Sequence, residues 1–106
     1  MNNRKVYISG EIVPEVDAKI SIFDSAVLLG DTVTESTRTF NFKPFKLDEH
    51  LERLYKSFKL TRIDPQMTIE EMKKVSLELL EINKDNYKAN EDCWLVHNIS
   101  RGHSIT

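Results

Sequence analysis

The sequence predicts an α+β fold in which an antiparallel sheet carries two helices packed on one face. Runs rich in Val, Ile, Thr and Phe, separated by turn residues, fill the first half of the chain. They favour strands, because β-branched and aromatic side chains fit a pleated surface. Two later segments carry apolar residues at helical spacing. A last apolar run, CWLVHNIS, reads as one more strand, which needs neighbouring strands for its backbone hydrogen bonds.

The composition is typical of a soluble globular domain. Of the 106 residues, 40% are hydrophobic and 30% are charged, which excludes collagen-like, low-complexity and mostly disordered chains. The formal charge of −2 gives no global basic field, so nucleic acid is not expected as a partner. No window approaches the roughly 18 apolar residues of a membrane span, and the start lacks the apolar core of a signal peptide. A single cysteine, Cys93, excludes an internal disulfide, and we expect a cytoplasmic protein.

Two hairpins are expected before the helices. The first joins residues 5–9 to residues 12–13 through a turn at Gly10. The second joins the strand at 30–40 to residues 44–47, with an Asn in the turn. Between the hairpins, KISIF favours a weak strand, and DSAVLLGD is expected to form an apolar, turn-rich link.

Two helices are expected next. The first runs from the N-cap Asp48 to about Leu60. Its expected buried face, with the spacing i, i+3, i+4 and i+7, comprises Leu51, Leu54, Tyr55 and Phe58. The second begins at Thr68, where Glu71 three residues later completes a capping box. Its expected apolar stripe comprises Ile69, Met72, Val75, Leu79 and Ile82.

The strand GDTVTESTRTF, residues 30–40, has two mostly polar faces. Side chains alternate between faces along a strand. One face carries Thr32, Thr34, Ser36, Arg38 and Phe40, and the other carries Val33, Glu35, Thr37 and Thr39. Each face bears a charge, so the strand is a candidate wall of a site. Arg38, set among Thr and Ser, is a candidate oxyanion contact; the alternative is a cross-strand ion pair with a carboxylate.

Other candidate chemistry is sparse. The histidines His50, His97 and His103 form no HExxH motif, and no paired CxxC is present, so no metal site is expected. The sequence has no Walker loop and no GxGxxG. Cys93 reads as a buried packing residue. Arg53, at the edge of an apolar stripe, reads either as a surface arginine or as an anion contact, since a guanidinium matches phosphate and carboxylate.

Three segments together resemble the N-terminal domain of the class IV, fold type IV aminotransferases, which use pyridoxal 5'-phosphate. The segments are YISGEIVPEVDAKISIFDSAVLLGD, TVTESTRTFNFKPFKLDEHLERLYKS and VHNISRG. They occur in the family's order and spacing and cover nearly the whole chain. The family includes branched-chain and D-amino-acid aminotransferases, (R)-selective amine transaminases and aminodeoxychorismate lyase.

The resemblance implies a two-domain enzyme, usually a homodimer, with the cofactor held between a small and a large domain. Such an enzyme transfers an amino group from a small-molecule amino donor, an amino acid or amine, to a keto-acid acceptor. In the family's EHLxRL motif the arginine, here Arg53, contacts the cofactor phosphate. The strand after GD supplies the substrate-pocket residues Thr34 and Arg38. The last strand supplies Trp94 and Val96.

Two departures from the family bear on specificity. The family commonly has Phe or Tyr where this chain has Thr34, and often EGIR where this chain has ESTR. Branched-chain members have a substrate-facing arginine where this chain has Val96. The resemblance therefore does not imply branched-chain specificity.

The resemblance also implies a longer protein. The family's Schiff-base lysine lies beyond the last residue of this chain, so the sequence is expected to contain no catalytic residue. Residues 1–106 are then the N-terminal small domain of a two-domain enzyme, inactive without the C-terminal catalytic domain. Two alternatives stay open. The parent is a lyase of the aminodeoxychorismate type, or the chain is a stand-alone, non-enzymatic domain that dimerises through its sheet.

Overall fold

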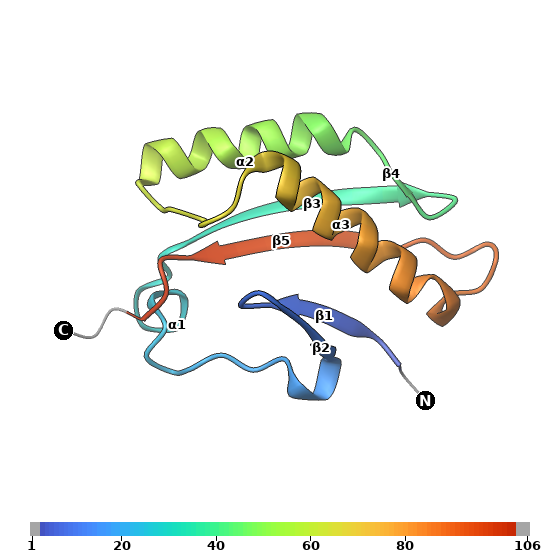
Figure 1. Cartoon of the computed structure of the whole chain (residues 1–106), viewed down its shortest axis with the longest axis horizontal. Helices are drawn as coiled ribbons and strands as arrows, with labels where there is room; N and C mark the ends of the chain where they lie inside the picture. The colour runs from blue at the N-terminus through green and yellow to red at the C-terminus, as the bar shows by residue number, and fades with distance from the viewer. Residues whose placement is uncertain (1–2, 104–106) are drawn as a thin grey trace.

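Two pairs of strands, each followed by helices, and a final strand make up the computed structural model, which describes residues 3–103 (Figure 1). The strands are β1 (Lys5–Ile8), β2 (Glu11–Pro14), β3 (Thr32–Phe40), β4 (Lys43–Pro44) and β5 (Trp94–Ser100). The helices are α1 (Ser25–Leu29), α2 (Leu47–Thr61) and α3 (Ile69–Asn83), with short 3-10 turns η1 (Glu15–Asp17) and η2 (Lys84–Asn86).

β3 is the central strand of a three-stranded antiparallel sheet with the order β4-β3-β5. β5 pairs with most of its length, from Thr32 opposite Ser100 to Arg38 opposite Trp94. β4 pairs only with the end of β3, at residues 39–40. β1 and β2 form a separate two-stranded sheet, and α3 packs against β1.

Both long helices pack on the same face of this sheet. Glu35 of β3 contacts α2, and the residue opposite it on β5, His97, contacts α3. Because directly opposite residues of an antiparallel pair lie on one face, α2 and α3 cover one side of the sheet. The predicted α+β class, with two helices on one face of an antiparallel sheet, is confirmed (Figure 1).

The hydrophobic core lies between this sheet face and the two helices. Its buried apolar residues are Leu47, Leu51, Leu54, Phe58, Ile63, Met72, Leu80 and Leu95. Leu51 and Leu54 are each 1% exposed, as the helical spacing predicts. Burying a Leu side chain contributes about 1.5–3 kcal/mol, so α2 is held mainly by this stripe.

Both predicted hairpins are present, but the return strand of the second covers only Lys43–Pro44 and not residues 44–47, since Leu47 already belongs to α2. At the first turn, Ser9 and Gly10 have φ values of 50° and 88°. At the second, Asn41 and Phe42 have φ values of 50° and 62°. Two consecutive residues with positive φ are typical of a type I′ turn, whose twist matches that of the flanking strands.

The segment between the hairpins differs from the prediction. Residues 19–23 form no strand, and DSAVLLGD contains the helix α1 in place of an irregular link. Asp24 caps this helix, since its Oδ1 accepts a hydrogen bond from the Ala26 N–H at 2.9 Å. Gly30 ends it with a left-handed φ of 66°. The cap and the terminal glycine are helix signals that outweigh the short apolar run.

α2 begins two residues earlier than predicted, so Asp48 is not its N-cap. Lys46 occupies that position with a φ of 55°, and its side chain makes no capping hydrogen bond. The helix begins at Leu47 because this side chain, 6% exposed, belongs to the core. Asp48 lies in the first turn, where a carboxylate is favoured by the helix dipole, and its Oδ1 lies 2.8 Å from Nζ of Lys73 on α3.

α3 begins as predicted, but its buried face is rotated from the predicted stripe. The capping box is present: the Glu71 N–H donates to Thr68 Oγ1 at 3.1 Å, and the Thr68 N–H donates to Glu71 Oε1 at 2.8 Å. The buried residues are Met72, Ser76, Leu80 and Asn83, whereas Ile82 of the predicted stripe is exposed. Two polar side chains turn inward because each has a hydrogen-bond partner there.

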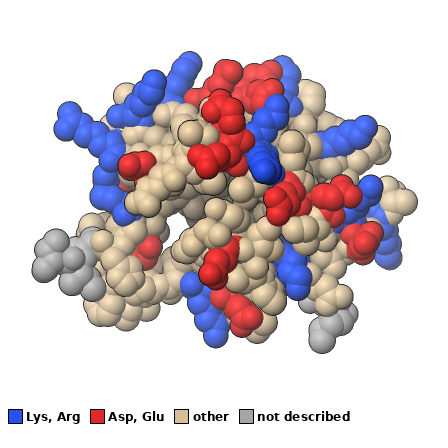
Figure 2. Space-filling model, in the orientation of Figure 1, with Lys and Arg blue, Asp and Glu red and all other residues tan. Residues whose placement is uncertain are grey.

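The surface mixes both charge signs. On the face shown in Figure 2, Lys and Arg side chains are interspersed with Asp and Glu. This distribution agrees with the small formal charge of −2. Within residues 3–103, no helix has both the length and the apolar character needed to cross a membrane.

Candidate functional site

The face of the sheet opposite the helices carries four of the predicted site residues. Thr34 and Arg38 lie on the exposed face of β3, and Trp94 and Val96 lie on the exposed face of β5. Arg38 is directly opposite Trp94 in the register. Trp94 is 66% exposed and Val96 is 55% exposed. We call these four residues the strand wall; alternation along two paired strands brings them onto one surface.

Hydroxyl and amide groups gather at the Thr34 end of the strand wall. Asn98 lies directly opposite Thr34. Its Oδ1 accepts hydrogen bonds from Thr34 Oγ1 at 3.0 Å and from Thr32 Oγ1 at 2.6 Å. Sequence reasoning missed Asn98, although its position two residues after Val96 on the same face would have indicated it.

Cationic and aromatic groups gather at the other end. The Arg38 guanidinium carbon lies 4.0 Å from the centroid of the Phe40 ring, which is a cation–π contact. The Phe40 ring in turn meets the Phe45 ring edge-on, with centroids 5.4 Å apart. Among the described residues no carboxylate forms an ion pair with Arg38, so the alternative of a cross-strand salt bridge is not found. Arg38 therefore offers its guanidinium to the exposed face.

The helix-covered face of β3 carries a buried carboxylate. Glu35 is 5% exposed. Both of its oxygens accept from Arg53 Nε, at 2.8 and 3.0 Å, and Oε1 also accepts from Arg53 Nη2. His50 Nδ1 lies 3.1 Å from the same Oε1. These hydrogen bonds hold the pKa of Glu35 below its usual value, and the largest contribution comes from Arg53. Burial of the carboxylate opposes this shift.

Arg53, the predicted phosphate contact, therefore lies on the helix side of β3. It lies three residues after His50 on α2, so both side chains reach Glu35 from the same helix face. Its side chain is 69% exposed. The structure brings the four residues of the strand wall together on one face of β3 and β5, and it places Arg53 on the opposite face. Thr34 of the strand wall and Glu35, the partner of Arg53, are adjacent in sequence.

A second buried group lies beside Glu35. His97 is 7% exposed, and its Nε2 lies 2.7 Å from Ser76 Oγ. Ser76 Oγ donates its only proton to the Met72 carbonyl at 2.7 Å, so it accepts from His97 Nε2–H. Nδ1 of His97 is then the unprotonated nitrogen, and within the described part of the chain it has no hydrogen-bond partner. Burial lowers the pKa of this imidazole.

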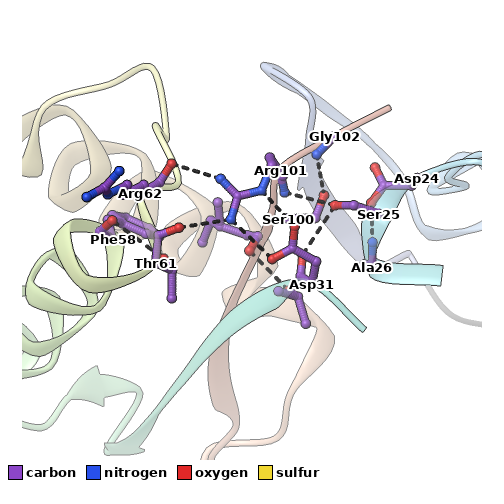
Figure 3. Close-up of polar contacts among 12 residues, drawn as sticks. Asp24, Ser25, Ala26, Asp31, Phe58, Thr61, Arg62, Ser100, Arg101 and Gly102 are labelled. Carbon is purple, nitrogen blue, oxygen red and sulfur yellow. Dashed lines mark hydrogen bonds and ion pairs between the residues drawn. The ribbon is translucent and has the colours of Figure 1, made fainter. Parts of the chain in front are cut away.

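The GD and RG dipeptides meet at one end of the sheet (Figure 3). Asp31 and Arg101 flank the last pair of the β3–β5 register, and Arg101 Nε donates to Asp31 Oδ2 at 2.7 Å. Nη1 and Nη2 of Arg101 donate to the carbonyls of Arg62 and Thr61, each at 2.9 Å. Arg101 thus satisfies carbonyl groups that the end of α2 leaves unpaired. Ser25 completes the junction, since its Oγ accepts from the Arg101 N–H at 3.2 Å.

Metal-ligating clusters and Cys93 were the other candidates for a site. Among residues 3–103, no cluster of three or more His, Cys, Asp or Glu side chains could hold a metal ion. Cys93 is half-buried against the core, less enclosed than predicted, and burial raises the pKa of its thiol.

Comparison with known proteins gives a consistent result. Residues 32–104 match the family model described as amino-transferase class IV. A protein of Methanocaldococcus jannaschii, whose provisional name is branched-chain-amino-acid aminotransferase, is 47% identical over 79 residues, which cover 74% of this chain and 27% of that protein. A D-alanine aminotransferase of Staphylococcus haemolyticus is 37% identical over 74% of this chain and 28% of its own length.

A solved structure is similar over most of the chain. The branched-chain aminotransferase of the thermophilic archaeon Thermoproteus uzoniensis, solved with norvaline, superposes with a TM-score of 0.78 at 27% identity. The match covers 93% of this chain and 33% of that protein. The chain therefore spans about a quarter to a third of the length of these relatives.

Proposed function

Because the chain belongs to the class IV aminotransferases, we propose that it is the N-terminal small domain of a longer two-domain enzyme. This enzyme transfers an amino group between an amino acid or amine and a 2-keto acid. Its C-terminal domain supplies the lysine that holds the cofactor. The short span of the chain relative to its relatives supports this division.

The strand wall is the observation that carries the proposal. A sheet face that only awaited packing would carry apolar residues, yet this face combines Thr34 and Arg38 with Trp94 and Val96. Binding sites commonly pair apolar and aromatic walls with a few placed polar groups. The exposed guanidinium of Arg38 is suited to a substrate carboxylate, since charge-assisted hydrogen bonds are the strong ones. Trp94 and Val96 exclude water from the same surface.

The chain's residues fit a phosphate-bearing cofactor. Arg53 is largely exposed and fixed at one edge of its guanidinium by Glu35, so its other donors are accessible. In the proposed enzyme Arg53 holds the phosphate of pyridoxal 5'-phosphate. When bound, this cofactor supplies an electron sink for the substrate's amine carbon. The strand wall binds and orients the substrate and shields it from water.

The assembly and location follow the same proposal. We place the parent enzyme in the cytoplasm as a homodimer. Contact with another domain or subunit is supported by three exposed apolar side chains of α1. Val27, Leu28 and Leu29 are 52%, 51% and 73% exposed.

The experiment begins with the gene. We expect the DNA after the codon for residue 106 to continue into a large domain with a suitably placed lysine. The full-length protein, assayed with amino donors and 2-keto acids, should convert the keto acid to the amino product. Absence of transamination with every donor would contradict the proposal. Pyruvate release from aminodeoxychorismate would instead support the lyase, and an immediate stop codon would support a stand-alone domain.

A further inference from the structure

We propose that Glu35 is a positioning residue that fixes Arg53, so that one edge of its guanidinium stays available for the cofactor phosphate. The inference rests on the proposed function. It assigns a role to the one charged side chain on the buried face of β3.

Glu35 is placed where a carboxylate needs partners. A buried charge is costly unless it is paired and hydrogen-bonded. Among the described residues, the hydrogen-bond partners of Glu35, which is 5% exposed, come only from α2: Arg53 on both oxygens and His50 on Oε1. The buried position of Glu35 beneath α2 is therefore explained by its hydrogen bonds to Arg53 and His50.

The geometry of the ion pair leaves part of the guanidinium free. A guanidinium has five N–H donors in one plane. Glu35 uses the edge formed by Nε and Nη2. One hydrogen of Nη1 and the second hydrogen of Nη2 form the end-on edge, and the side chain is 69% exposed. A phosphate can bind this second edge with two hydrogen bonds while Glu35 keeps the first.

Fixing Arg53 in advance favours phosphate binding. A free arginine loses rotamer freedom when it grips an anion, and this loss opposes binding. In the structure the guanidinium plane is already set by two hydrogen bonds from Nε and one from Nη2. The second edge is thus oriented before the phosphate arrives.

Glu35 also has an opposite effect, which makes the proposal testable. Its negative charge reduces the attraction between Arg53 and an anion. If charge alone mattered, Glu35→Gln would tighten phosphate binding. If positioning matters, the same change loosens it. A third possibility is that Glu35 only fastens α2 to β3, in which case ligands with and without a phosphate are affected equally.

The experiment compares two ligands that differ only in the phosphate. Dissociation constants for pyridoxal 5'-phosphate and for pyridoxal are measured by spectroscopic titration of the full-length protein. We expect Glu35→Gln to weaken binding of the phosphate form by roughly tenfold, as loss of an orienting partner commonly does, and to leave pyridoxal unchanged. Glu35→Asp, one methylene shorter, should weaken it in the same direction and serves if Glu35→Gln fails to fold.

Two controls separate the explanations. Glu52→Gln removes an exposed carboxylate next to Arg53 on α2 and should change neither constant. On an Arg53→Ala background, Glu35→Gln should have no further effect on the phosphate form. Tighter or unchanged binding of the phosphate form by Glu35→Gln, or equal loss for both ligands, would overturn the role of Glu35. A wild-type protein that does not prefer the phosphate form would instead overturn the assignment of Arg53.

Discussion

Glu35 and His97 lie directly opposite each other on β3 and β5, both beneath the helices, with 5% and 7% of their surface exposed. Each is held by a different helix: Glu35 by Arg53 of α2 and His97 by Ser76 of α3. A pair of buried polar side chains thus joins both helices to the sheet. This arrangement makes the stability of the domain depend on pH and on the hydrogen bonds of each partner.

The first prediction concerns pH. Burial lowers the pKa of His97 below the usual 6.5, while the carboxylate of Glu35 acts to raise it and His50 to lower it. As the pH falls from 6.5 towards this lower value, the unfolded chain binds a proton that the folded chain does not. The free energy of unfolding therefore decreases with falling pH in this window. Chemical denaturation between about pH 8 and about pH 5 measures it.

A variant at the same position isolates this effect. His97→Gln removes the titrating group and should flatten the pH dependence between about pH 8 and about pH 5.5. Closer to pH 4.5, the ordinary pKa of a glutamate, protonation of Glu35 in the unfolded chain also contributes. An equal slope for His97→Gln and the wild type would show that His97 is not the responsible group.

The second prediction concerns Ser76. Ser76→Ala removes the acceptor of the His97 Nε2–H, so a buried donor loses its partner. We expect the free energy of unfolding to fall by about 1–3 kcal/mol. Urea denaturation at neutral pH measures the change. Ser57→Ala, at a half-buried serine of α2, should cost clearly less; equal costs for the two changes would contradict the role of the Ser76–His97 hydrogen bond.

These contacts show what could be predicted from sequence. Alternation along β3 correctly separated Glu35, Thr37 and Thr39 from Thr34, Ser36 and Arg38, because the period of a strand is a local property. Which face the helices cover could not be predicted, since both faces are polar. In α2, by contrast, the hydrophobic spacing was sufficient to predict the buried face, because the buried residues of this helix are apolar.

Polar partners distant in sequence account for the error on the buried face of α3. The buried face of α3 includes Ser76 and Asn83, whose partners, His97 and the backbone of Lys5, lie 21 and 78 positions away. Nothing in the local pattern of α3 indicates these partners. The roles of Arg53 and the strand wall stay predictions, supported by the family resemblance and by their placement.

The third prediction concerns Arg101. Arg101→Ala removes the donors to Asp31 and to the carbonyls of Thr61 and Arg62 at the end of α2. The contact is partly exposed, so we expect a loss in the free energy of unfolding that is smaller than the loss caused by Ser76→Ala. Hydrogen exchange should show faster opening of the last turn of α2.

Two further variants test the geometry of this junction. Arg101→Lys keeps the charge but lacks the planar fork and should recover only part of the loss. Arg62→Ala removes an exposed side chain and leaves the carbonyl that Arg101 binds, so it should have little effect. Full recovery by lysine would show that the charge alone stabilises the junction.

The fourth prediction concerns Arg38 and follows from the proposed function. Arg38→Gln in the full-length enzyme removes a charge-assisted contact to a substrate carboxylate, worth about 1.5–3 kcal/mol, so KM for 2-keto acids should rise roughly 10- to 100-fold. Donor amines that lack a carboxylate provide an internal control, because their KM should not change. Steady-state kinetics with both substrate classes measures the difference. An equal rise for amines and keto acids would show that Arg38 maintains the shape of the strand wall and does not bind the carboxylate.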